Sequence, residues 1–228
     1  MPRALDGGRQ THGIVRIGDT VRRPLHARSA DVHRLFGHLQ AVGFDGAPRY
    51  LGTDEDGREV LTYLPGDAIH HLPAGLSDAQ LVSAAQLVRR FHDATAGSAL
   101  VEGDEVVCHG DLGPHNMLFD GDVAVGIIDW DDGVAPGPRL VDFAHAVWCC
   151  ADVCEPEVDV AEQARKVRVM CAAYGSMEPA AIVDEITDRF RRARAGHAAN
   201  DRPRGVTVFD ESLAWMARNA EALKRERA

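Results

Sequence analysis

The sequence lacks the features that mark several classes of protein. It has no apolar run near the ~18 residues that a membrane-spanning helix needs. Residues 1–12 contain no apolar core of a signal peptide. Its five cysteines are an odd number, which argues against a framework of paired disulfides. No repeat, low-complexity tract or Gly/Ser-rich linker divides the chain. These absences predict a cytoplasmic globular protein with no membrane partner.

Positive charge is also scarce. The chain has 25 Lys and Arg against 35 Asp and Glu, a formal net charge of −10, and no basic stretch long enough to follow a nucleic-acid backbone. Nucleic acid is therefore excluded as a partner. An acidic surface raises the local concentration of cations, so a cationic ligand is compatible, although solubility alone is the better explanation of the charge. With 228 residues, 45% of them hydrophobic, the chain can bury an ample core.

The most informative segment spans residues 109–116, with the sequence HGDLGPHN. A β-prone run leads into it and another leads out, and Asp129 follows thirteen positions later at the end of an apolar run. A strand, loop, strand arrangement brings Asp111, Asn116 and Asp129 to one edge of the molecule. Phosphoryl transfer from a nucleotide needs such a set, because one carboxylate accepts the hydroxyl proton while an amide oxygen and a second carboxylate hold Mg²⁺. The alternative, a polar turn between two strands, explains less of the pattern.

This segment, with IDWD at residues 128–131 and PRLVDFA at residues 138–144, resembles the aminoglycoside phosphotransferase-like family of the protein-kinase-like fold, which includes choline and homoserine kinases. The resemblance extends more loosely over about residues 5–148. It implies an α+β, two-lobed structure. Residues 1–64 would form a small β-rich, nucleotide-binding N-terminal lobe, and residues 65–228 a larger helical, catalytic and substrate-binding C-terminal lobe.

The resemblance also implies roles in the catalytic site. It places Asp111 and His109 there, with His109 expected to brace the loop rather than to carry protons. Asp142 is expected to hold the same loop through its backbone or through His109. His92, after Phe91, is expected to be structural.

The first lobe offers candidates for nucleotide binding. β-prone runs at residues 13–17 and 20–23 flank Gly18 and Asp19, which predicts a hairpin. The paired glycines Gly7 and Gly8, just before it, match the family's phosphate-covering loop, and a flexible terminal loop is the alternative. The resemblance requires a basic residue on the third strand. Arg23 is preferred to Arg22 because it shares a strand face with Val21.

Two further parts of this lobe are expected from the resemblance. Tyr63 and Leu64 would meet the nucleotide base at a hinge between the lobes. The helix expected at residues 29–42 would carry a Glu that pairs with the basic strand residue. That helix offers only Asp31 and His33 near its start, so the ion pair is in doubt.

The second lobe is expected to be helical. Residues 77–80 form a capping box that begins a helix. Apolar stripes predict further helices at about residues 157–174, 179–194 and 209–225. Cys149, Cys150 and Cys154 are close in sequence, but their spacing completes no zinc pattern, so buried packing is favoured over a metal site.

The predicted function is transfer of the γ-phosphate of ATP or GTP, with Mg²⁺, to a hydroxyl of a small molecule. An antibiotic or another natural product is the first candidate acceptor. A cationic acceptor is suggested by acidic residues that follow the catalytic loop, namely Asp131, Asp132, Asp152, Glu155, Glu157 and Asp159. Two alternatives stay open: a nucleotide-binding protein with little catalysis, and a metal-dependent phosphate-ester hydrolase.

Overall fold

An antiparallel sheet forms the first lobe. The computed structural model describes residues 3–4, 13–70, 75–131 and 134–225. The strand order in the sheet is β1-β2-β3-β5-β4. The strands are β1 (Arg3–Ala4), β2 (Val15–Ile17), β3 (Thr20–Arg23), β4 (Tyr50–Thr53) and β5 (Glu59–Thr62). Strands β2 and β3 pair around the turn at Gly18 and Asp19, so the predicted hairpin is confirmed.

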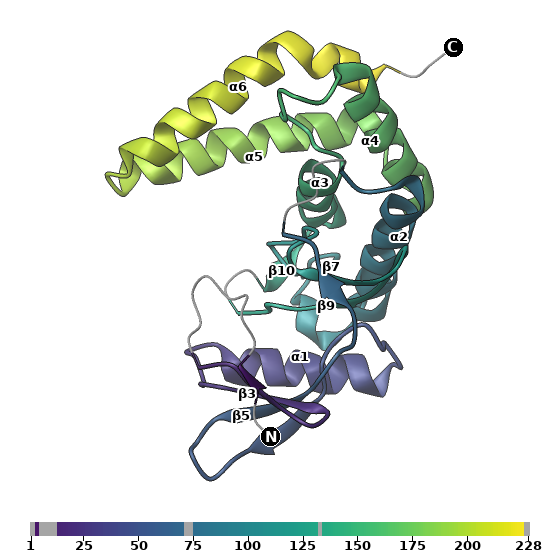
Figure 1. Cartoon of the computed structure of the whole chain (residues 1–228). Coiled ribbons are helices and arrows are strands. Elements are labelled where there is room, and N and C mark those ends of the chain that lie inside the picture. Colours follow the sequence, from purple (N-terminus) through teal and green to yellow (C-terminus); the bar gives the residue numbers. More distant parts are fainter. Residues whose placement is uncertain (1–2, 5–12, 71–74, 132–133, 226–228) are drawn as a thin grey trace.

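One helix, α1 (Ser29–Ala41), accompanies this sheet (Figure 1). Its buried apolar residues recur at helical spacing and form one face: Val32, Leu35, Phe36 and Leu39. Phe36 meets the ring of Trp130 edge-on, with centroids 5.8 Å apart. Because Trp130 follows Asp129 in the chain, this contact packs the helix against the segment that carries a predicted metal ligand.

The connection out of the sheet passes through Gly66. It joins β5 to the short strand β6 (Asp67–Ala68), which pairs with β8 (Met117–Asp120) in the three-stranded sheet β6-β8-β9. Gly66 has φ of 114°, and a Cβ there would lie 3.0 Å from the carbonyl oxygen of Phe119. Only glycine fits this crossing without strain.

The remaining strands support the predicted catalytic loop. Strand β7 (Val106–Cys108) leads into the loop and pairs with β10 (Ala135–Gly137). Strand β9 (Val123–Ile127) pairs with β8, and a short 3₁₀ helix, η1 (Ala99–Val101), precedes β7.

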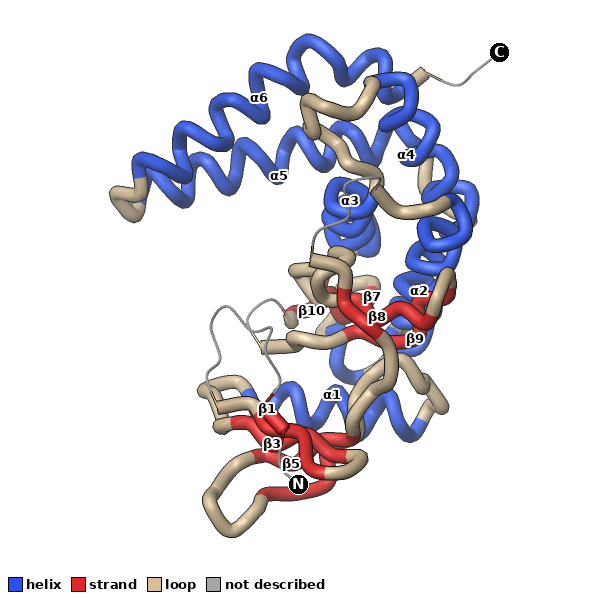
Figure 2. The backbone as a smooth tube through the Cα atoms, in the orientation of Figure 1, coloured by secondary structure: helices blue, strands red, loops and turns tan. Residues whose placement is uncertain are grey.

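Helices make up most of the second lobe (Figure 2). They are α2 (Asp78–Thr95), α3 (Arg139–Cys150), α4 (Val160–Tyr174), α5 (Pro179–Ala199) and α6 (Pro203–Lys224). The predicted capping box is present at the start of α2, between Ser77 and Gln80. The last three helices were also predicted, with ends that differ by a few residues. Within the described parts of the chain, no helix is both long and apolar enough to span a membrane.

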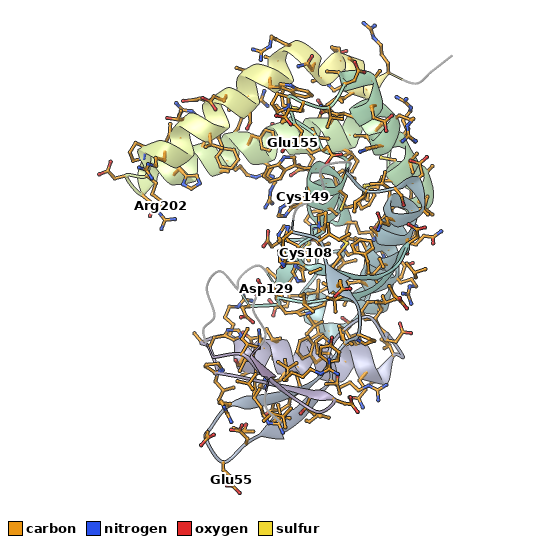
Figure 3. The ribbon with its side chains drawn as sticks, in the orientation of Figure 1. Glu55, Cys108, Asp129, Cys149, Glu155 and Arg202 are labelled. Carbon is orange, nitrogen blue, oxygen red and sulfur yellow. The ribbon has the colours of Figure 1, made fainter. Side chains whose placement is uncertain are left out.

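Helices α5 and α6 form an antiparallel arm that projects from the helical body (Figure 1). The chain as a whole is curved like a letter C, and Arg202 marks the tip of this arm (Figure 3). Asp129 and Cys149 lie below the arm, on the inner side of this curve (Figure 3). Helix α5 also packs against α3. The arm therefore contributes side chains to the same region as the catalytic loop.

Candidate active site

The predicted catalytic loop is held together by Asn116. Its side-chain nitrogen donates hydrogen bonds to the backbone oxygen of Asp111 at 2.9 Å and to the carboxylate of Asp111 at 3.0 Å. The Asn116 side chain is buried, whereas the side chain of Asp111 is 55% exposed. The amide nitrogen thus fixes the aspartate, and the amide oxygen is left as a donor for a cation.

Asp129 lies beside Asn116 because of the register between β8 and β9. Met117 pairs with Ile127, and the backbone nitrogen of Ile128 donates to the backbone oxygen of Asn116 at 2.9 Å. Asp129 has φ of 64°, an uncommon conformation for a residue other than glycine, and it turns the chain away from the strand. The structure therefore brings Asp111, Asn116 and Asp129 together, as the sequence pattern predicted.

The charge environment of Asp129 suits a cation. Burial raises the pKa of this carboxyl, and the neighbouring Asp131 raises it further. Mg²⁺ prefers oxygen ligands and is commonly held by one or two protein groups together with phosphates, so the oxygens of Asn116 and Asp129 fit this ion. In the described residues, no three His, Cys, Asp or Glu side chains form a metal cluster, so Asn116 and Asp129 are the candidates for holding a cation here.

Asp142, on α3, holds the catalytic loop from below. Its carboxylate accepts hydrogen bonds from the backbone nitrogens of His109 at 2.9 Å and Gly110 at 2.7 Å, and from Nε2 of His92 at 3.0 Å. Burial alone would raise the pKa of Asp142, but the hydrogen bond from His92 and the nearby His109 lower it. The predicted brace is confirmed, and so is the structural position of His92, which also bonds Tyr174.

His109 connects the loop to the strand that ends at Asp129. Its Nε2 donates to the backbone oxygen of Ile128 at 3.0 Å, and its ring packs edge-on against Trp130. Burial lowers the pKa of His109, so the ring is neutral at pH 7 with its proton on Nε2. These contacts leave His109 as a positioning residue.

Arg23 has an ion-pair partner that the sequence did not reveal. Its Nε lies 2.5 Å from the carboxylate of Glu59, which is fully buried. Glu59 belongs to β5 and faces Arg23 directly across the sheet. His33, on α1, reaches the other oxygen of Glu59 at 2.5 Å. The helix supplies no carboxylate to Arg23, as the sequence indicated, and the register of two strands supplies one instead.

Arg23 also reaches the second lobe. Its Nη2 lies 2.6 Å from Asp131, and Nε2 of His26 lies 3.1 Å from the same oxygen. Arg22 points elsewhere, with contacts to Thr20 and Asp54 of the first lobe. The choice of Arg23 as the residue that faces the site agrees with this geometry.

The other residues predicted to bind the nucleotide are Tyr63, Leu64, Gly7 and Gly8. The backbone nitrogen of Tyr63 donates to Asp19 at 2.9 Å, and its ring lies under the guanidinium of Arg16. Tyr63 is thus engaged within the first lobe, and Leu64 is the better candidate for contact with a base. Gly7 and Gly8 lie outside the described residues.

A cavity of about 510 Å³ opens beside Asp111. It lies between the catalytic loop, α3 and the α5–α6 arm, and Cys149 in its wall faces the inner side of the curve (Figure 3). Its lining residues are Asp111, His115, His145, Trp148, Cys149, Arg189, Arg192, Ala193 and Phe209. Apart from Asp111, the sequence analysis identified none of them as site residues, although His145, Trp148 and Cys149 have the spacing of one helix face.

Two histidines set the electrostatics around Asp111. His115, whose Nε2 is 3.6 Å from the carboxylate, is the main cause that lowers the pKa of Asp111 to about 2. His145 donates from Nδ1 to the oxygen of Gly110 at 2.8 Å, and burial lowers its pKa to about 4. His145 is therefore neutral at pH 7, and its unprotonated Nε2 faces Asp111 at 3.6 Å. A hydroxyl placed between these two acceptors could donate to either.

The acidic residues that suggested a cationic acceptor do not line this cavity in the described part of the chain. Asp131, Asp152, Glu155, Glu157 and Asp159 are all absent from its lining. Asp152 instead pairs with Lys166 at 2.6 Å, and Asp131 pairs with Arg23. Asp132 lies outside the described residues. The cysteine prediction is better supported, since Cys150 is buried and all five cysteines are free.

Comparisons with known proteins show the family of this chain. A profile of the phosphotransferase enzyme family matches residues 30–180. The trifolitoxin immunity protein of Rhizobium leguminosarum bv. trifolii is 30% identical over 97% of this chain and 94% of its own length.

Solved structures give the same fold. An aminoglycoside 2'-phosphotransferase-IIIa, determined as its GDP complex, has a TM-score of 0.63 at 16% identity and covers 94% of this chain and 92% of its own. The macrolide 2'-phosphotransferase MphH of Brachybacterium faecium has a TM-score of 0.61 at 16% identity, with 88% and 86% covered. The chain has the protein-kinase-like fold of these enzymes, and it belongs to the phosphotransferase enzyme family.

Proposed function

We propose that this protein transfers the γ-phosphoryl group of ATP or GTP to a hydroxyl of a small molecule. The observation that carries the proposal is the register of β8 and β9, which sets Asp129 beside Asn116 while Asn116 fixes Asp111. We place the nucleotide against a lobe of residues 1–64 and the acceptor against residues 65–228. The strand pairing supports this boundary, because β5 belongs to the first sheet and β6 to the second.

In this proposal Asp111 aligns the hydroxyl and takes its proton. A carboxyl whose pKa is about 2 is a weak base, so alignment and charge contribute more than early proton removal. That balance suits a loose phosphoryl-transfer transition state, in which the attacking oxygen gains little bonding early. Asn116 and Asp129 would hold Mg²⁺, which neutralises phosphate charge when bound. His109 and Asp142 keep the loop in place.

Arg23 is the proposed contact to the nucleotide phosphates. Its planar guanidinium can bind two phosphate oxygens at once, and Glu59 fixes its orientation from behind. Asp131 occupies one edge of the guanidinium, so a phosphate would compete with this carboxylate for Arg23. Leu64 is the proposed contact to the base, and the family resemblance extends the proposal to Gly7 and Gly8.

The relatives support finer points of the proposal. The GDP in the aminoglycoside phosphotransferase complex supports a test of GTP beside ATP. The names of the macrolide phosphotransferase and of the trifolitoxin immunity protein support an antibiotic or related natural product as acceptor, and hence a role in resistance. Free cysteines and the need for nucleoside triphosphates support a cytoplasmic location.

The two alternatives make different demands. A nucleotide-binding protein with little catalysis was suggested by the missing helix Glu and the short first lobe. The pair of Arg23 with Glu59 weakens the first of these reasons, because it gives Arg23 a carboxylate partner from a strand. A phosphate-ester hydrolase would need no nucleotide, so calorimetry with ATP, GTP and Mg²⁺ separates it from a kinase.

Asp111→Asn tests the proposal directly. The amide keeps the size of the side chain but cannot accept the hydroxyl proton, and we expect turnover to fall by ~10²–10⁴-fold while nucleotide affinity and melting temperature are retained. The assay measures nucleotide consumption across an alcohol and antibiotic library, with Asp120→Asn on the exposed end of β8 as a matched control. A variant at position 111 with wild-type turnover would contradict the assignment.

A further inference from the structure

Arg189 differs from the other arginines of α5. Three of them pair with carboxylates: Arg191 with Asp188, Arg192 with Glu185 and Arg194 with Asp210. Arg189 has no salt bridge to any carboxylate in the described part of the chain. Its guanidinium instead donates to the backbone oxygen of Gly110 at 3.3 Å and lies 6.0 Å from the ring centroid of Trp148.

The lack of a carboxylate partner is unusual for an arginine in the position of Arg189. Its side chain lines the cavity beside Asp111 and is partly buried, and burial lowers its pKa. A guanidinium that has lost part of its hydration without gaining a carboxylate is less stable than a paired one. Its charge is satisfied most directly by an anion that enters the cavity, and its planar fork matches a carboxylate.

The rest of the lining agrees with an anionic ligand. Arg192 lies at the exposed rim, where its charge is paired with Glu185, and Asp111 is the one carboxylate among the described residues that line the cavity. Asp111 is already required for the hydroxyl. His145 is neutral, whereas Trp148 and Phe209 offer apolar surface for a carbon skeleton.

We propose that the acceptor carries a carboxylate that binds Arg189, in addition to the hydroxyl that it presents to Asp111. This inference rests on the proposed phosphotransferase function and names its substrate class. The hydroxyl lies at the catalytic-loop end of the cavity and the carboxylate at the α5 end, so the pair of groups sets the orientation of the acceptor. The charge preference is opposite to the one suggested by the acidic composition of the chain.

The test uses Trp148 as a reporter, because Arg189 lies over its ring. Hydroxylated carboxylic acids and their primary amides, in matched pairs, are titrated against tryptophan fluorescence, and Trp148→Phe identifies the signal from this residue. We expect each acid to bind about ten- to a hundredfold more tightly than its amide, as a charge-assisted hydrogen bond allows. Arg189→Met should remove this preference, and Arg189→Lys should keep part of it.

Arg191→Met is the matched control. It removes the same charge from the same helix outside the cavity, so the acid preference should persist. Amides or amines that bind as tightly as the acids, a preference that survives Arg189→Met, or a panel without any response would each overturn the proposal.

The result can be separated from failure of the phosphotransferase function. Asp111→Asn should lose turnover and still prefer acids in the fluorescence titration. If acids bind without any nucleotide consumption, the proposed enzyme activity is contradicted and the proposed carboxylate site is retained. If only amides or amino alcohols cause nucleotide consumption, the enzyme activity is retained and the carboxylate site is contradicted.

Discussion

Replacing Glu59 with Gln tests how the first lobe positions Arg23. Glu59 is fully buried, and its two oxygens each lie 2.5 Å from a nitrogen, one of Arg23 and one of His33. Glutamine keeps one acceptor oxygen but turns an N–H group toward one of these donors. At least one charge-assisted hydrogen bond is therefore lost.

Such a loss costs about 1.5–3 kcal/mol of unfolding free energy when the partner stays buried. At about 2–4 °C per kcal/mol for a protein of this size, the melting temperature should fall by roughly 3–12 °C. Nucleotide affinity should also fall, but less than in Arg23→Met, where the whole phosphate contact disappears and a loss of about ten- to a hundredfold is expected. Thermal melting and calorimetry with Mg²⁺ and nucleotide measure the two effects.

Two control variants should leave these quantities unchanged. Glu55→Gln, at the exposed turn between β4 and β5 (Figure 3), should change neither quantity. Arg22→Met should leave nucleotide affinity unchanged, because Arg22 contacts Asp54 rather than Asp131. A double-mutant cycle between Glu59→Gln and Arg23→Met should show coupling above about 0.5 kcal/mol, since the two side chains touch. Additive effects with an unchanged melting temperature in Glu59→Gln would refute the reasoning.

Two other predictions concern the metal and pH. Asp129→Ala should abolish Mg²⁺-dependent nucleotide binding and Asn116→Ala should only weaken it, because a neutral amide binds the cation less strongly than a carboxylate. If Mg²⁺ titrations of both variants are equal and unaltered, the metal binds at another site. His145 has its pKa lowered from 6.5 to about 4, so the unfolded chain binds a proton that the folded chain does not, and stability should fall by up to about 3 kcal/mol as pH drops through that window. His145→Gln should flatten this dependence in urea unfolding at pH 7 and pH 4.5, whereas an unchanged slope would assign it to other groups.

Local patterns were enough to predict much of the molecule. The catalytic loop could be read because Asp111 and Asn116 lie five residues apart and their hydrogen bonds are local. The brace by Asp142 followed from the family resemblance. The helices followed from apolar stripes, which report burial along a single element.

The missed features all depend on contacts between distant segments. Glu59 became the partner of Arg23 through the register of β3 and β5, which no single strand encodes. Arg189 became part of the site because α5 packs against α3 above the catalytic loop. Overall acidity suggested a cationic ligand, but net charge is a property of the whole surface, whereas binding depends on the few charges that line one cavity.

Helix α3 connects the two halves of this site. Asp142 on one of its turns holds the backbone of the catalytic loop, and His145, Trp148 and Cys149 on the following turns line the cavity. Residues at i, i+3, i+6 and i+7 share a helix face, so one rigid element fixes the position of Asp111 relative to the acceptor wall. Arg189 packs onto that wall from α5 and bonds the loop at Gly110. Changes at the α5 residue should therefore alter which acceptor is bound, while the chemistry stays anchored through α3.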